Sequence, residues 1–131
     1  MIGLDTNVMV RYLTHDHPAQ TAAATRLIDS LSQDMPGFLS LVVLIELVWV
    51  LESSYRFKRD EITAVMEAIL RSDEMVTERV DIAWQAVRMY RTTQAGFADA
   101  LIERLAHAAG CDHTVTFDRN AAASAGMKLL N

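Results

Sequence analysis

The stretch MIGLDTNV, residues 1–8, opens the chain with a short apolar run that ends in an acid. The apolar residues 2–4 are followed directly by Asp5. A short apolar run bounded by polar residues is consistent with a buried β-strand. We therefore expect a first strand that ends at Asp5 and a helix that starts near Thr6 or Asn7.

Further short apolar runs alternate with longer segments whose apolar residues recur every three or four positions, as in amphipathic helices. The further expected strands are Gly37–Ser40, Met75–Glu78, His113–Phe117 and Met127–Leu130. The expected helices are Ala19–Leu31, Val42–Tyr55, Glu61–Leu70, Ile82–Tyr90 and Phe97–Ala109. Alternation of this kind predicts parallel strands, right-handed helical crossovers and helices on both faces of the sheet. The expected fold is therefore a three-layer α/β domain.

The composition is typical of one globular domain, which we expect to span residues 1–131. Hydrophobic residues make up 51% of the chain, enough to form a core without disulfides. The single cysteine, Cys111, cannot form an intramolecular disulfide, which favours a reducing compartment. No secretion signal is recognisable, and the longest apolar stretch, Leu39–Leu51, is shorter than the about 20 residues that a membrane helix needs. We expect a cytoplasmic protein without a membrane partner.

The net charge of −5 limits how the chain can contact nucleic acid. A broad phosphate-binding face needs clustered Lys and Arg, and the overall charge has the wrong sign for one. The charge still suits a nuclease whose carboxylates gather in one cation-binding pocket with basic residues around it. Any nucleic-acid contact is therefore expected to be local.

Two acids follow expected strands directly. Asp5 ends the first strand, and Asp118 follows the apolar run of residues 114–117 in the same way. Because ligands bind outside the carboxyl ends of strands in open α/β sheets, we expect both acids at one edge of the sheet. For either acid alone, a helix N-cap is the simpler interpretation, since Asp is favoured there.

Two more acids interrupt apolar helical segments. Glu46 lies in the run of residues 41–49, where a charge is costly to bury unless it faces a polar cavity or a partner. Asp99 lies early in the helix from Phe97, where it could simply favour the helix dipole. Two carboxylates about 4 Å apart repel by roughly 4 kcal/mol at an effective dielectric near 20, and a bound cation relieves that cost. Together the acids predict a Mg²⁺ site that hydrolyses phosphodiesters.

Four segments resemble PIN-domain ribonucleases of the VapC type, the toxins of toxin–antitoxin pairs. They are IGLDTNV at 2–8, LIELVWV at 44–50, FADALI at 97–102 and TFDR at 116–119. Their order and spacing are more specific than any one of them. The resemblance extends from Met1 to Leu130 and implies a PIN-like domain with a small parallel β-sheet flanked by helices.

The resemblance also implies residue roles. The acidic quartet that it assigns to catalysis and to binding Mg²⁺ or Mn²⁺ is Asp5, Glu46, Asp99 and Asp118. Asp5 and Asp99 are the first candidates for direct ligands. Thr6 and Asn7 would be supporting polar groups.

The implied partners are an RNA substrate, a second copy of the chain in a homodimer, and a VapB-like antitoxin that covers the active cleft in a heterooligomer. One position departs from the family pattern. Many relatives have a further acid three residues before the position of Asp99, where this chain has Gly96. We expect this difference to alter the affinity for metal before it affects activity.

Two other functions fit parts of the sequence. An aspartyl-phosphate enzyme, such as a phosphatase of the haloacid dehalogenase type, would use Asp5 as its nucleophile. That family has a second acid two residues later, where this chain has Asn7. The other alternative is a catalytically inactive PIN-like module that only binds a partner. The presence of all four acids argues against it.

Two polar segments could be mistaken for functional sites. The loop YRFKR at 55–59 could bind single-stranded RNA by stacking and phosphate contacts. A solvated loop whose aromatic residues pack into the core is the simpler interpretation. His15 and His17 flank Asp16, and we interpret them as part of a polar turn without a catalytic role.

Overall fold

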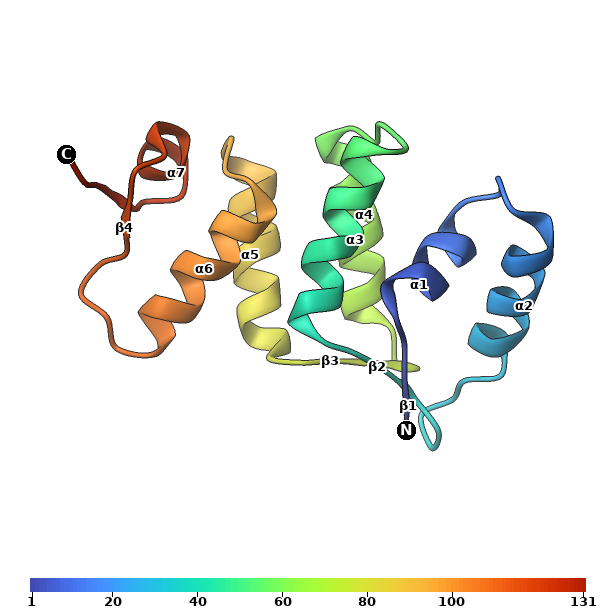
Figure 1. Cartoon of the computed structure of the whole chain (residues 1–131). Helices are drawn as coiled ribbons and strands as arrows, with labels where there is room; N and C mark the ends of the chain where they lie inside the picture. Colours follow the sequence, from blue (N-terminus) through green and yellow to red (C-terminus); the bar gives the residue numbers. More distant parts are fainter.

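The computed structural model describes residues 1–131 and alternates strands with helices (Figure 1). In chain order the elements are β1 (Ile2–Gly3), α1 (Thr6–Leu13), α2 (Pro18–Asp29), β2 (Gly37–Leu39), α3 (Leu41–Ser53), α4 (Arg59–Arg71), β3 (Met75–Thr77), α5 (Val80–Thr92), α6 (Phe97–Ala108), β4 (Val115–Thr116), α7 (Arg119–Ser124) and β5 (Lys128–Leu129). Each predicted strand and helix is present, with boundaries that differ by a few residues. The α/β class and the small parallel sheet flanked by helices are confirmed.

The strands pair only in parallel, but they form two sheets rather than one. One sheet has the order β1-β2-β3, and the other consists of β4 and β5. In register, Gly37 of β2 lies between Ile2 of β1 and Met75 of β3. The prediction that Asp5 and Asp118 share one sheet edge is therefore wrong, because β4, which leads to Asp118, pairs only with β5.

The separate position of β4 follows from how little of it is buried. Val115 and Phe117 are 52% and 79% exposed, so this segment contributes little to the main core of 23 residues. The unit β4–α7–β5 packs instead through a small cluster of its own. The members of that cluster are Ala95, Ala121, Ala125 and Met127.

The main core lies where the helices meet the three-stranded sheet. Figure 1 shows β1, β2 and β3 at the foot of the molecule, with α3 and α4 rising between the α1–α2 pair and the α5–α6 pair. Leu44, Leu47 and Leu51 of α3 are fully buried there. Gly37 at the start of β2 leaves room for Leu4, since a Cβ at this position would lie 2.7 Å from Leu4 Cδ1 and the leucine side chain would have to shift. None of the helices is long and apolar enough to span a membrane.

Helix α3 keeps one face in solvent, which corrects the expectation that Glu46 is in an apolar environment. Val42 and Trp49 are 65% and 66% exposed, and Glu46 between them is exposed as well. Their spacing of four and then three residues places them on the same helix face. The run of residues 41–49 is therefore apolar in composition but only partly buried in the fold.

Candidate functional site

Asp5 follows β1 and begins α1, as the sequence predicts. Its backbone has the N-cap conformation, but its side chain makes no capping hydrogen bond. The carboxylate is exposed and forms no ion pair with any Lys or Arg. Helix capping therefore does not explain this acid, and its oxygens are free to bind a ligand.

Thr6 connects the start of α1 to the middle of α3. Its side chain is buried, and its Oγ1 donates a hydrogen bond of 2.6 Å to Glu46 Oε1. This bond orients Glu46 and leaves its second carboxylate oxygen free. Asn7, in contrast, lines a separate pocket between α1 and α2 with Arg11 and makes no hydrogen bond to the four acids.

The other two acids meet at the starts of α6 and α7. Asp99 lies in the first turn of α6, and Asp118 is the N-cap of α7. Asp118 Oδ1 accepts hydrogen bonds from the backbone N–H groups of Asn120 (2.8 Å) and Ala121 (3.2 Å), so capping does explain this acid in part. The Asn120 side chain donates to the Gln94 carbonyl at 3.1 Å, which ties the start of α7 to the loop before α6.

The surroundings of Asp99 disfavour its negative charge. Partial burial raises the pKa of the Asp99 carboxyl above its ordinary value, and repulsion from Asp118 raises this pKa further. No Lys or Arg forms an ion pair with either carboxylate. A cation between these two acids would remove the repulsion that their proximity creates.

The four acids form two groups rather than one cluster. No three His, Cys, Asp or Glu side chains lie close enough to one another to hold a metal ion. Glu46 is hydrogen-bonded to Thr6, the residue that follows Asp5, while the carboxylates of Asp99 and Asp118 repel each other. The donor chemistry nevertheless fits Mg²⁺ or Mn²⁺, because Mg²⁺ commonly takes one or two protein carboxylates and keeps several waters.

A cavity of about 250 Å³ lies between α3 and the start of α6. Its lining residues are Ile45, Val48, Trp49, Glu52, Gly96, Phe97, Ala98 and Asp99. Trp49 is apolar but largely exposed, so it lies outside the buried core. Glu52 was not predicted as a site residue from the sequence. The available signal was its position one helical turn after Trp49 on the segment that carries Glu46.

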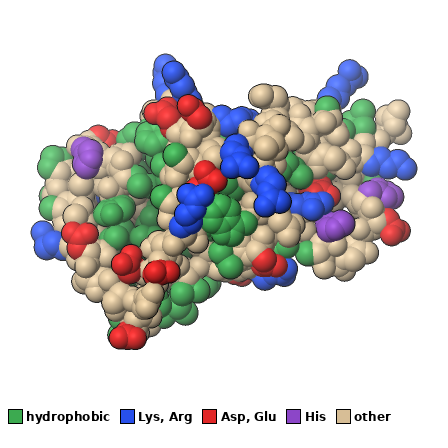
Figure 2. Space-filling model, turned by 180° about the vertical axis from the view of Figure 1, so that it is seen from behind, with side chains coloured by type: hydrophobic (Ala, Val, Ile, Leu, Met, Phe, Trp, Pro, Cys, Tyr) green, Lys and Arg blue, Asp and Glu red, His purple; other side chains and the backbone are tan.

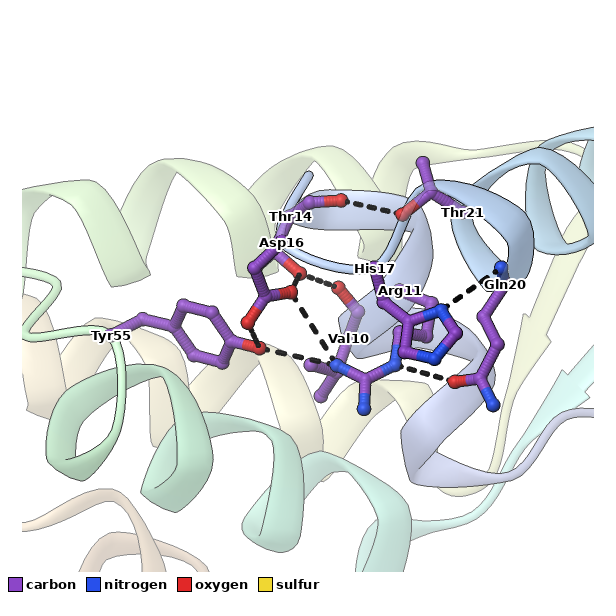
Figure 3. Close-up of polar contacts among 8 residues, drawn as sticks. All are labelled: Val10, Arg11, Thr14, Asp16, His17, Gln20, Thr21 and Tyr55. Atoms are coloured by element: carbon purple, nitrogen blue, oxygen red, sulfur yellow. Dashed lines mark hydrogen bonds and ion pairs between the residues drawn. The ribbon is translucent and has the colours of Figure 1, made fainter.

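The turn between α1 and α2 is structural, as predicted (Figure 3). Asp16 accepts a hydrogen bond of 2.8 Å from the Tyr55 hydroxyl and forms an ion pair of 3.5 Å with Arg11. The Tyr55 hydrogen bond is the main reason why the pKa of Asp16 lies below its ordinary value. His17 Nδ1 accepts from the Gln20 N–H at the start of α2. These contacts fasten the turn to the end of α3.

Arg59, which ends the basic segment 55–59 and is the first residue of α4, also has a structural role. Its Nη1 donates to the carbonyls of Tyr90 and Ala95 at 2.8 Å each, and its guanidinium lies 4.1 Å from the Tyr90 ring centroid. Phe57 packs against the main core. The aromatic residues Tyr55 and Phe57 therefore pack against the core, as the simpler interpretation expects, whereas Arg59 is not a solvated loop residue but binds backbone carbonyls.

Basic side chains also occur on the face opposite to that of Figure 1. Figure 2 shows Lys and Arg across the middle of this face, with acidic side chains among them. Glu67 of α4 pairs with Arg71 at 3.8 Å and with Arg91 of α5 at 3.4 Å. Part of the positive charge on α4 and α5 is therefore neutralised within the protein.

Comparison with known proteins identifies relatives over most of the chain. A family model described as the PIN domain matches residues 2–126, which include the four acids and the cavity beside Asp99. A VapC ribonuclease from Aquifex aeolicus (strain VF5) is 30% identical over 117 residues. The aligned region is 88% of this chain and 86% of that protein.

Proposed function

Because this chain belongs to the PIN-domain family, we propose that it is a VapC-type endoribonuclease, the toxin of a toxin–antitoxin pair. One observation carries the proposal beyond the family match. Asp99 and Asp118 lie close enough for Asp118 to raise the pKa of Asp99, yet neither acid has a cationic partner in the chain. An uncompensated carboxylate pair of this kind suits the binding of a divalent cation and of an RNA phosphate beside it.

The proposed cofactor is Mg²⁺ or Mn²⁺. Asp99 and Asp118, whose carboxylates interact, would hold it, and Asp5 and Glu46 are the other two acids of the proposed metal site. When bound, the cation would neutralise charge that develops on the phosphodiester and would supply an activated water. Its positive charge would also reduce the repulsion between RNA and a chain whose net charge is −5.

Thr6 has a supporting part in this proposal. Its hydroxyl donates a hydrogen bond to Glu46 Oε1. Glu46 Oε2 therefore remains available to accept a hydrogen bond from a water molecule at the phosphodiester. Thr6 is itself buried, which restricts the movement of the Glu46 side chain. Asn7 lies on a different pocket, and we assign it no direct role.

The proposed partners are RNA, a second copy of the chain and a VapB-like antitoxin, all in the cytoplasm. Val42 of α3, the helix that carries Glu46, is 65% exposed, and Phe117, which directly precedes Asp118 between β4 and α7, is 79% exposed. Large exposed apolar side chains near a functional site often contact partner proteins. These two positions are therefore the first places to look for antitoxin contacts.

The decisive experiment is cleavage of total bacterial RNA by the purified, partner-free chain, with new RNA ends read by sequencing. We expect cleavage with Mg²⁺ or Mn²⁺, none with EDTA, and none for Asp5→Asn or Asp99→Asn. The matched control is Asp34→Asn, which should cleave normally, because Asp34 is an exposed acid in the loop before β2. Undiminished cleavage in EDTA or by Asp99→Asn would contradict the proposed mechanism.

A metal titration separates an active enzyme from an inactive partner-binding module. Calorimetry with Mn²⁺ should show binding to the native chain that is weaker in Asp99→Asn and Asp118→Asn and unchanged in Asp34→Asn. Binding should also raise the melting temperature, since a ligand that binds only the folded state stabilises it. Absence of both metal binding and cleavage would favour the inactive module.

A further inference from the structure

Trp49 is an exposed aromatic side chain beside the proposed catalytic site. It is 66% exposed and lies on α3 one turn after Glu46, on the same helix face. It also lines the cavity that Asp99 borders. An exposed tryptophan offers a flat surface on which an unpaired base of single-stranded RNA can stack.

The cavity has the size and lining expected for a small flat group. Its volume of about 250 Å³ is below the range of roughly 300–1,000 Å³ that is typical of sites for drug-sized ligands. Phe97 and Val48 contribute apolar walls, and Glu52 and Asp99 contribute the carboxylates. The cavity therefore combines stacking surface with hydrogen-bond acceptors.

Glu52 is held in place by a buried tyrosine. The Tyr90 hydroxyl donates a hydrogen bond of 2.6 Å to Glu52 Oε2, and Tyr90 is only 1% exposed. The ring of Phe97 packs edge-on against the Tyr90 ring at 6.2 Å, and the Arg59 guanidinium covers it at 4.1 Å. Burial and the nearby Glu52 carboxylate raise the pKa of Tyr90, so its phenol remains a donor at neutral pH. Glu52 Oε1 is left free to accept another hydrogen bond.

We infer that this cavity binds one nucleobase of the substrate RNA, which stacks on Trp49 and donates an exocyclic N–H to Glu52. The inference rests on the proposed ribonuclease function and extends it to substrate selection. A carboxylate accepts hydrogen bonds only, so the exocyclic amino group that cytosine presents at the edge of its ring suits Glu52, whereas uracil has a carbonyl at that position and can donate only from its ring N3–H. Because Asp99 borders the same cavity, the bound base would lie next to the phosphodiester that is cleaved.

Tryptophan fluorescence tests the stacking directly. Trp84→Phe leaves Trp49 as the only indole, and Trp49→Phe leaves Trp84, which lies on α5 with the Arg71 guanidinium 5.5 Å from its ring centroid. Both are combined with Asp5→Asn to prevent cleavage and titrated with oligo(C) and oligo(U) decamers in Mg²⁺. We expect saturable quenching of Trp49 but not of Trp84, with oligo(C) binding more tightly than oligo(U).

Two further variants test the roles of Trp49 and Glu52. By fluorescence anisotropy of labelled decamers, Trp49→Ala should bind oligo(C) about tenfold or more weakly, and Trp49→Phe should recover part of the loss. Glu52→Gln should reduce the preference for oligo(C) over oligo(U), because an amide both donates and accepts hydrogen bonds. Unchanged affinity in Trp49→Ala together with unquenched Trp49 fluorescence would overturn the inference.

The outcomes separate this inference from the proposed function. If the native chain cleaves RNA and Trp49→Ala cleaves the same sites at the same rate, only the base site is wrong. If the native chain does not cleave RNA but Trp49 is quenched by oligo(C), the proposed nuclease function fails and the base site stands. Quenching of Trp49 by arginine amide but by neither decamer would overturn the base assignment in favour of a guanidinium from a protein partner.

Discussion

The Thr6 hydroxyl lies 2.6 Å from Glu46 Oε1 and joins two residues that are 40 positions apart in the chain. The donor is buried and the acceptor is exposed, so the core of the protein fixes the orientation of a carboxylate in solvent. A hydrogen bond to a carboxylate that binds a ligand fixes the direction in which its free oxygen points. This one is the only hydrogen bond that connects α1 to a site acid on α3.

Replacing Thr6 by valine should therefore affect activity more than stability. Thr6→Val keeps the side-chain shape and removes the donor, which should cost about 1 kcal/mol of unfolding free energy because water can solvate the released Glu46. Cleavage should slow roughly 10- to 100-fold, the range seen when such supporting contacts are lost. Urea unfolding and RNA cleavage rates measure the two effects. Thr6→Ser, which keeps the hydroxyl, is the control, and equal cleavage by both variants would contradict the assigned role.

The Asp99–Asp118 interaction predicts how stability varies with pH. The pKa of Asp99 is raised in the folded chain, so the unfolded chain loses this proton first as the pH rises. The unfolding free energy of the metal-free protein should decrease as the pH rises from the unfolded pKa of Asp99, near 3.8, to its folded pKa. At higher pH the unfolding free energy should stay at this reduced value. Asp99→Asn should therefore stabilise the metal-free chain at pH 7 but not below the unfolded pKa.

When Mn²⁺ is bound, ionisation of Asp99 should stabilise the folded chain instead of destabilising it. Binding requires ionised Asp99, so affinity for Mn²⁺ should increase as the pH rises through the folded pKa of Asp99. Thermal unfolding at several pH values, with and without Mn²⁺, measures both trends, and Asp34→Asn serves as the matched control. Equal melting temperatures of Asp99→Asn and the native chain at pH 7 without metal would count against the repulsion.

Gly96 offers a way to add an acid to the site. It is the N-cap of α6 with φ −67° and no side-chain cap, and a Cβ there would meet only Asp99 Oδ2, at an ordinary 3.7 Å. Gly96→Asp should therefore fold, with a capping gain of a few tenths of a kcal/mol. Its carboxylate should strengthen Mn²⁺ binding several-fold. Gly96→Asn provides the same cap without the charge, and equal Mn²⁺ affinities of the two variants would refute the electrostatic explanation.

The parts of the fold that the sequence predicts well are those decided by local spacing. Helices α2 to α6 follow from apolar residues that recur every three or four positions over ten or more residues. The sequence could not predict that the side chain of Asp5 is free, because an acid that follows a strand can be either a helix N-cap or a ligand-binding residue. Only the structure shows that Asp118 makes capping bonds and that Asp5 does not.

The parts that could not be predicted depend on contacts between distant segments. Glu46 and Trp49 are exposed because the neighbouring helices cover the other face of α3. When nearly all residues of a helix are apolar, the sequence does not show which face is buried. The start of α7, where Asp118 lies, contacts residues far away in the sequence, as in the hydrogen bond from Asn120 to Gln94, 26 residues away. Strand β4 pairs over two residues only, so its choice of partner is weakly specified by its own sequence.

The role of Arg59 can be tested in the same way, because a basic residue at the start of a helix beside a basic loop is easily mistaken for an RNA contact. Its Nη1 binds the carbonyls of Tyr90 and Ala95, and its planar guanidinium stacks on the Tyr90 ring. Lysine keeps the charge but lacks this geometry, so Arg59→Lys should lower the unfolding free energy by about 2 kcal/mol. Arg26→Lys, at an exposed position on α2, should change it little. Urea unfolding measures stability, and RNA cleavage well below the melting temperature measures activity. A variant of Arg59 with native stability and impaired cleavage would assign Arg59 to RNA, whereas reduced stability with cleavage retained would assign it to the fold.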